Sequence, residues 1–185
     1  MPDAPPGRPA LDANTIAFAG RVFQMARGGH APELAALLAA GLPANLINDK
    51  GDSLLMLASY HGHLDTVRAL MAHGGDPTLA NDRGQVPLAA AAFKGYADII
   101  EAMLEGGAAL DGCGPDGKTA LMMAAMFDRA EMVDVLPARG ADPAARDAAG
   151  LTARDLADRM GATEAAARLA AMGQGGTGSR DTRCR

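Results

Sequence analysis

Two histidines, His61 and His63, form the first feature of the sequence that could support chemistry. Imidazoles this close together can share a metal ion, but protein metal sites usually need three or four ligands, and no third ligand is evident in the sequence. His63 follows a glycine, as does His30 33 residues earlier, so it is expected to hold a structural position in a repeated turn. We expect no metal and no other cofactor. A metal-dependent protein that uses His61 and His63 stays open as the alternative.

Cys113 is the second candidate, because a thiolate is a strong nucleophile once a base activates it. No histidine or carboxylate constellation is identifiable around it, so a loop thiol is the preferred interpretation and an enzyme using Cys113 is the alternative. The nearby residues Gly112, Gly114 and Gly117 match Gly-x-Gly-x-x-Gly, which binds nucleotides only between a strand and a helix. A helix is expected to end at Gly107 instead, so the match is interpreted as a turn.

The composition favours a helical protein without catalytic machinery. Of the 185 residues, 49% are hydrophobic and only 3% aromatic, so Ala, Leu and Met, all strong helix formers, must fill most of the core. The net charge of -5 argues against a nucleic-acid surface, which needs clustered Lys and Arg. No hydrolase, kinase, P-loop or zincin motif occurs, and we therefore expect that the protein is not an enzyme.

The sequence contains no recognisable targeting signal. Met1 to Pro9 is rich in proline and lacks the basic start and apolar run of a signal peptide. Val86 to Phe93, among the longest apolar stretches, is far too short to cross a bilayer. The two cysteines, Cys113 and Cys184, are too few for a disulfide framework, which favours a reducing compartment. We expect a cytoplasmic protein that does not enter a membrane.

The elements that must position these residues come from an internal repeat of 33 residues. Several independent columns share this period, which chance rarely produces in so short a chain. The columns are Gly51, Gly84, Gly117 and Gly150; Gly41, Gly74, Gly107, Gly140 and Gly173; Ala58, Ala91, Ala124 and Ala157; and Leu37, Leu70, Met103, Leu136 and Leu169.

Residues 81–113 illustrate one unit. Asn81 to Gly84 is a turn signal, and Pro87 lies where a first short helix would begin. Lys94 to Tyr96 breaks that helix, and a second helix is expected to end at Gly107. Two helices of this size cannot bury their apolar faces alone, whereas stacked units can. We therefore predict an all-α solenoid of about five helix-turn-helix units joined by β-turn or hairpin loops.

This unit resembles the ankyrin repeat, whose signature is Thr-Pro-Leu-His-x-Ala. The matching segments are residues 53–58, 86–91 and 119–124, and the Gly-His pairs and the Gly-Ala-Asp at 140–142 also fit. The resemblance implies a small stand-alone ankyrin-repeat protein of bacterial type. It covers about residues 14–173, in units of about 14–47, 48–80, 81–113, 114–146 and 147–173. Residues 1–13 and 174–185 fall outside it and are expected to be disordered.

The sequence departs from the family pattern in three places. The signature histidine is missing, so the Thr–His hydrogen bonds expected of the family are absent and stability should be lower. Pro137 is expected to shorten or kink the second helix of the fourth unit. Arg154 and Asp158 give the fifth unit the polar face of a terminal cap. The column of the signature histidine holds Met56, Ala89, Met122 and Asp155.

The resemblance implies a partner protein bound across the turn tips and the exposed side of the first helices, as an adaptor, inhibitor or regulator. We expect a monomer. Three of the six aromatic residues fall in this set, and exposed aromatics often anchor a partner. The alternative is that Phe93 and Phe127 fold back onto neighbouring helices. The expected partner-binding residues are Lys50, Asp52, Tyr60, His61, Arg83, Gln85, Phe93, Lys94, Asp116, Lys118, Met126 and Phe127.

Overall fold

The computed structural model describes residues 12–173, and within them the chain forms ten helices and no strand. The one isolated β-bridge joins Ile47 and Ser53 across a turn. The prediction of an all-α repeat solenoid is therefore confirmed. The helices are α1 (Ala13–Gly28), α2 (Ala31–Ala39), α3 (Leu54–His61), α4 (Leu64–Ala72), α5 (Pro87–Lys94), α6 (Ala97–Glu105), α7 (Ala120–Met126), α8 (Ala130–Ala138), α9 (Ala153–Met160) and α10 (Thr163–Gly173).

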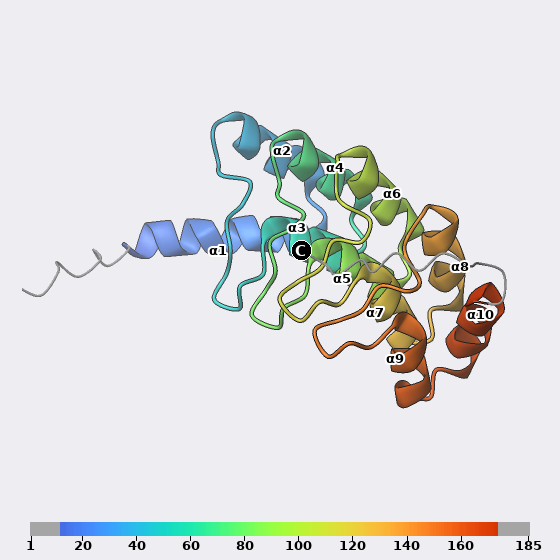
Figure 1. The fold of residues 1–185 in the computed structure, drawn as a ribbon. Helices are drawn as coiled ribbons and strands as arrows, with labels where there is room; N and C mark the ends of the chain where they lie inside the picture. Colours follow the sequence, from blue (N-terminus) through green and yellow to red (C-terminus); the bar gives the residue numbers. More distant parts are fainter. Residues whose placement is uncertain (1–11, 174–185) are drawn as a thin grey trace, which may run out of the picture.

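The helices form two rows along the solenoid (Figure 1). The first helices of the units, α1, α3, α5, α7 and α9, each contact the next one in their row. The second helices stack as α2 on α4 on α6 and as α8 on α10, while contact between α6 and α8 is sparse. The long loops that lead from a second helix to the next first helix project together past the first-helix row (Figure 1). Turn tips of successive units therefore lie side by side.

Side-chain hydroxyls begin three of the first helices. Ser53, Thr119 and Thr152 each accept a hydrogen bond from the backbone N–H three residues later, at 3.0 to 3.3 Å. These caps satisfy an amide that the helix itself leaves unpaired. Val86 occupies the same column before α5 and provides no side-chain cap. The hydroxyls of the signature column thus keep a capping role although the signature histidine is absent.

The first helices end on left-handed residues. In α1, α3, α5 and α9 the residue is a glycine with φ between 71° and 85°, a conformation that glycine adopts without strain. After α7 the equivalent residue is Asp128, the one non-glycine with positive φ (54°) in the described residues. Its Oδ1 accepts a hydrogen bond of 2.8 Å from the backbone N–H of Ala165, near the start of α10. Asp128 therefore ties the fourth unit to the last helix.

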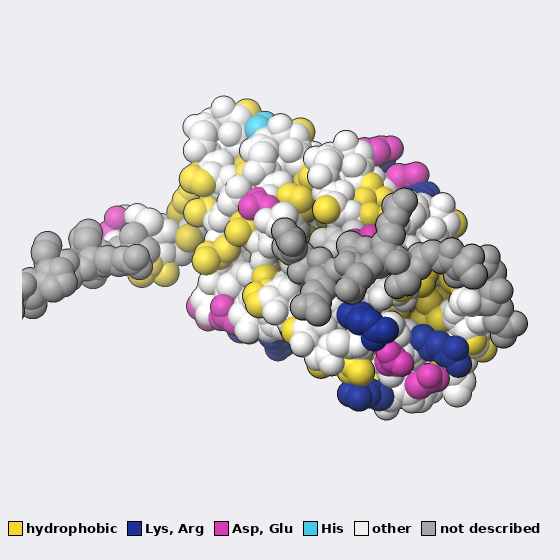
Figure 2. Space-filling view, in the orientation of Figure 1, with side chains coloured by type: hydrophobic (Ala, Val, Ile, Leu, Met, Phe, Trp, Pro, Cys, Tyr) yellow, Lys and Arg dark blue, Asp and Glu magenta, His cyan; other side chains and the backbone are white. Residues whose placement is uncertain are grey.

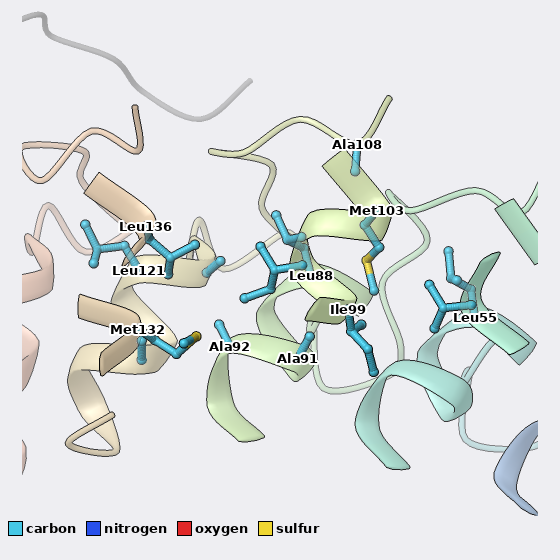
Figure 3. Packing of buried hydrophobic residues seen from close by; sticks show 14 of the residues in the cluster. Leu55, Leu88, Ala91, Ala92, Ile99, Met103, Ala108, Leu121, Met132 and Leu136 are labelled. Carbon is cyan, nitrogen blue, oxygen red and sulfur yellow. The ribbon is translucent and has the colours of Figure 1, made fainter. Parts of the chain in front are cut away.

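One continuous apolar core runs through all the units. Figure 3 shows its centre, where Leu88, Ala91 and Ala92 of α5 face Met103 of α6 and Leu121 of α7. Ala91 and Ala92 are fully buried, and their small side chains allow the helices to approach closely. Each large buried aliphatic side chain contributes about 1.5–3 kcal/mol relative to its exposed state. Burial in this core thus accounts for the packing that isolated helix pairs could not achieve.

Two expectations about helix ends are corrected by the structure. Pro137 does not shorten α8, which has nine residues like α2, α4 and α6. It lies in the last turn, where the backbone N–H of Arg139 donates to the carbonyls of Val135 and Leu136 and closes the helix. The second helix of the third unit ends at Glu105, two residues before the predicted Gly107.

The two ends of the array differ from its middle. α1 has 16 residues, twice as many as α3, and its first half extends beyond the stack (Figure 1). At the other end Arg154, Asp155 and Asp158 are exposed, and charged side chains gather over α9 at the lower right of Figure 2. The expected polar face of the fifth unit is present. Residues 1–11 and 174–185, including most of the predicted disordered segments and Cys184, lie outside the described residues.

Candidate functional site

Three aromatic side chains from successive units form an aromatic row, defined as Tyr60, Phe93 and Phe127. They come from the carboxyl-terminal ends of α3, α5 and α7. The rings of Tyr60 and Phe93 are stacked with centroids 6.2 Å apart, and those of Phe93 and Phe127 meet edge to face at 4.4 Å. The structure therefore brings together three residues of the predicted binding set that are up to 67 positions apart in sequence.

The aromatic row is partly packed and partly open. Phe93 is half-buried and packs with Val86, Ala89 and Met123 in a small cluster apart from the main core. Tyr60 remains 39% exposed and Phe127 40% exposed. Both interpretations of these rings thus hold in part, since Phe93 folds back onto its neighbours while the rings on either side of it present apolar surface to solvent. Such surface is where a partner gains the most from contact.

Cationic side chains accompany the aromatic row. The Lys94 ammonium lies 4.6 Å from the ring centroid of Tyr60, and the Arg129 guanidinium lies 5.7 Å from that of Phe93. Arg129 also donates from Nε to the backbone carbonyl of Phe93 at 2.7 Å. Contacts of this kind between a cation and a ring face are attractive and hold both groups in place. Lys94 was expected from the sequence, whereas Arg129 was not.

His63 holds two units together. Its Nε2 lies 2.8 Å from the backbone carbonyl oxygen of Arg27, 36 residues earlier, which is the same spacing that separates Arg129 from Phe93. This contact supports the structural role expected for His63. Arg129 occupies the equivalent column, which holds His30, His63 and Tyr96 in the preceding units. That column was the signal in the sequence that could have pointed to Arg129.

His61 lies at the end of α3 with its ring 6.4 Å from that of His63. Burial lowers the pKa of His61, and the charges of Arg27, His63 and Lys94 lower it further. Within residues 12–173 no group of three His, Cys, Asp or Glu side chains is arranged to hold a metal ion. With one of the two imidazoles engaged by a backbone carbonyl, nothing in the geometry favours the metal-dependent alternative.

A groove of about 510 Å³ lies between the first helices and the turn tips of the second and third units. Its floor includes Met56 and Leu57, and Arg27 of α1 closes one side. The sequence did not point to Arg27, because α1 lacks the turn tip that precedes the other first helices. Six of the predicted binding residues line the groove, namely Lys50, Asp52, Tyr60, His61, Arg83 and Gln85.

Several predicted binding residues are used within the turns themselves. Asp52 accepts hydrogen bonds from the side-chain amides of Asn48, at 3.3 Å, and Asn81, at 2.9 Å. Asp116 accepts from the backbone N–H of Lys118 and forms a 3.0 Å ion pair with its ammonium group. These carboxylates shape the turns. Lys50, Arg83 and Phe127 are the members of the predicted set with the fewest contacts of this kind.

Cys113 lies half-buried in the loop between α6 and α7. Its sulfur is not a free thiol, so the expectation of a loop thiol is wrong and the structure offers no nucleophile here. The neighbouring glycine motif lies in a turn, as expected. A Cβ at Gly114 would overlap the backbone carbonyl of Gly84, so the glycine serves a close approach between two turns.

The stacked helix pairs, the glycine-ended turns and the row of first helices define the class of helical repeat solenoids. The profile of ankyrin repeats (3 copies) matches residues 22–111 and 55–147, which together cover more than half of the chain. The chain therefore belongs to the ankyrin repeat family. Proteins of this family are generally protein–protein interaction modules and are typically not enzymes.

The chain is also similar to an ankyrin repeat protein of Pseudomonas aeruginosa. The two are 56% identical over 62 residues, which are 34% of this chain and 35% of that protein. The match thus spans about a third of the relative's length. None of the described helices is both long and apolar enough to span a bilayer.

Proposed function

We propose that this protein is an adaptor, inhibitor or regulator that binds one partner protein through the turn tips and the exposed side of its first helices. The observation that carries the proposal is the aromatic row, in which Tyr60 and Phe127 keep about two fifths of their surface exposed beside a half-buried Phe93. An apolar strip of this kind, bordered by polar turn tips, has the anatomy of a protein interface. It lies alongside a groove that can receive a side chain.

The proposal covers the other expectations about the partner and the setting. The partner is another protein, and neither nucleic acid nor a membrane is involved. The chain acts as a monomer in the cytoplasm. The net charge of -5 supports the exclusion of nucleic acid, because a polyanion would be repelled by the molecule as a whole.

The test compares the proteins captured by the tagged wild-type chain with those captured by Phe127→Ala combined with Lys94→Glu. Phe127 is preferred to Phe93 because truncating the half-buried Phe93 would disturb its small cluster. The matched control combines Met160→Ala with Arg68→Glu. Met160 is 54% exposed and stands 33 residues after Phe127, and Arg68 is exposed on α4 in the other helix row.

We expect quantitative mass spectrometry to show a specific captured protein that the first variant loses and the control retains, with both variants melting close to the wild type. Equal capture of that protein by the first variant at an unchanged melting temperature would remove this surface from the function.

A further inference from the structure

The charged groups that accompany the aromatic row are predominantly cations. Arg27, Lys94 and Arg129 come from three successive units and lie beside Tyr60, His61 or Phe93. Asp128 is the nearby acid, and one of its carboxylate oxygens accepts a hydrogen bond from the backbone of α10. This basic aromatic row, defined as the aromatic row with Arg27, Lys94 and Arg129, is thus positive in a protein whose net charge is -5.

Within the described part of the chain, these three cations have no carboxylate within 4.0 Å. Cations elsewhere are paired. Arg139 binds Glu101 across α6 and α8 at 3.1 Å, and Arg168 binds both Asp134 and Glu164. The protein therefore neutralises cations on its second helices and leaves those beside the exposed rings without an internal counter-ion.

The pKa of His61 reports the potential at this surface. After burial, the charges that lower it belong to Arg27, His63 and Lys94, and no carboxylate acts in the opposite direction. The field beside the aromatic row is therefore positive. A partner that approaches it with carboxylates gains attraction over several ångströms, and the gain falls as salt screens it.

We propose that the basic aromatic row binds an acidic segment of the partner protein that also carries an aromatic or aliphatic side chain. This inference rests on the proposed function and specifies the chemistry of the partner. The exposed rings and the groove accept the apolar side chain, while the Lys94 ammonium and the guanidinium groups of Arg27 and Arg129 face the carboxylates. Complementary charge sets the orientation of the segment and the rate at which it associates.

A protein segment fits this surface better than a nucleic acid does. The turn tips on the far side of the groove carry the carboxylates of Asp49 and Asp82, which alternate with Lys50 and Arg83. A continuous polyanion would meet those carboxylates, whereas a segment with a few spaced acidic residues can match the cations and avoid the acids.

The experiment selects short random peptides displayed on phage against the immobilised full chain and then measures the affinity of synthetic versions by fluorescence polarisation. We expect the selected peptides to combine Asp or Glu with an aromatic or aliphatic residue. Lys94→Glu should weaken their binding about tenfold, which corresponds to about 1.4 kcal/mol. Arg68→Glu, which changes the net charge equally on α4, should leave it nearly unchanged.

Four outcomes would overturn the inference. They are the absence of enriched peptides, selected peptides without acidic residues, binding that Lys94→Glu leaves unchanged, and displacement of the peptides by a single-stranded oligonucleotide that binds more tightly. Peptides that depend on Phe127 but not on Lys94 would leave the proposed binding surface intact and remove only its acidic preference. Peptides that ignore both residues would count against the proposed surface as well.

Discussion

Asp128 provides a sharp test of how the fourth unit holds the last helix. It adopts the left-handed conformation that glycine adopts after α1, α3, α5 and α9, and its carboxylate accepts the backbone N–H of Ala165. The two roles make opposite contributions to stability. Three substitutions separate them, because glycine removes both the strain and the acceptor, alanine removes only the acceptor, and asparagine keeps an acceptor.

The magnitudes follow from these contacts. A left-handed residue with a Cβ costs about 1–2 kcal/mol, and less for Asp or Asn. The hydrogen bond to an amide at a helix start contributes about 1 kcal/mol, and a negative charge there adds about 0.3–1 kcal/mol. We therefore expect Asp128→Ala to lower the free energy of unfolding by about 2 kcal/mol. Asp128→Gly should lower it by about 0.5 kcal/mol and Asp128→Asn by about 0.3–1 kcal/mol.

Two measurements read the two roles separately. Urea denaturation gives the free energy of unfolding, and amide hydrogen exchange gives the local protection of Ala165 at the start of α10. Exchange at Ala165 should accelerate in the glycine and alanine variants and change little in the asparagine variant. The reasoning is refuted if Asp128→Ala is as stable as Asp128→Gly, or if Ala165 keeps its full protection in the glycine variant.

Three further predictions concern other elements. Thr119→Val should lower the free energy of unfolding by about 1 kcal/mol through loss of the α7 cap, while Thr119→Ser should not, as measured by thermal denaturation. Gly114→Ala should lower it by about 1–3 kcal/mol because the new Cβ meets a backbone carbonyl, whereas Gly20→Ala in α1, where the Cβ meets nothing within 4 Å, should raise it by about 0.5–1 kcal/mol; urea titration distinguishes the two. Hydrogen bonds from Thr152 lower the pKa of Asp155, so its contribution is present above the unfolded pKa near 4 and is lost as pH falls through the folded value. Asp155→Asn should therefore be less stable at neutral pH and lose less stability on acidification, and unchanged pH profiles of urea denaturation would contradict this.

The sequence was sufficient for the architecture because the repeat is written in residues that act locally. Glycines such as Gly62 and Gly95 end helices through their own backbone conformation, and Ser53 and Thr119 cap helices that begin at the next residue. Their effect depends on neighbours a few positions away. A column of such residues therefore predicts the same element in every unit.

The site was harder to predict because its contacts cross between units. Whether Phe93 is buried depends on Met123 of the next unit, and the position of Arg129 depends on a carbonyl 36 residues earlier. The effect of Pro137 was overestimated because a proline in a last turn removes a hydrogen bond where the helix is already ending. The use of Asp52 within a turn rather than toward a partner follows from the approach of Asn81 in the adjacent turn.

The contacts of His63 with the carbonyl of Arg27 and of Arg129 with that of Phe93 span the same 36 positions. Removal of residues 84–116 would join Arg83 to Gly117, which belongs to the same column as Gly84. Arg129 would then stand 36 positions after Tyr60 and could reach that carbonyl instead. Duplication or loss of one whole repeat in the gene can therefore lengthen or shorten the binding surface while each junction keeps its bond, so the extent of the surface can evolve separately from the way it is held together.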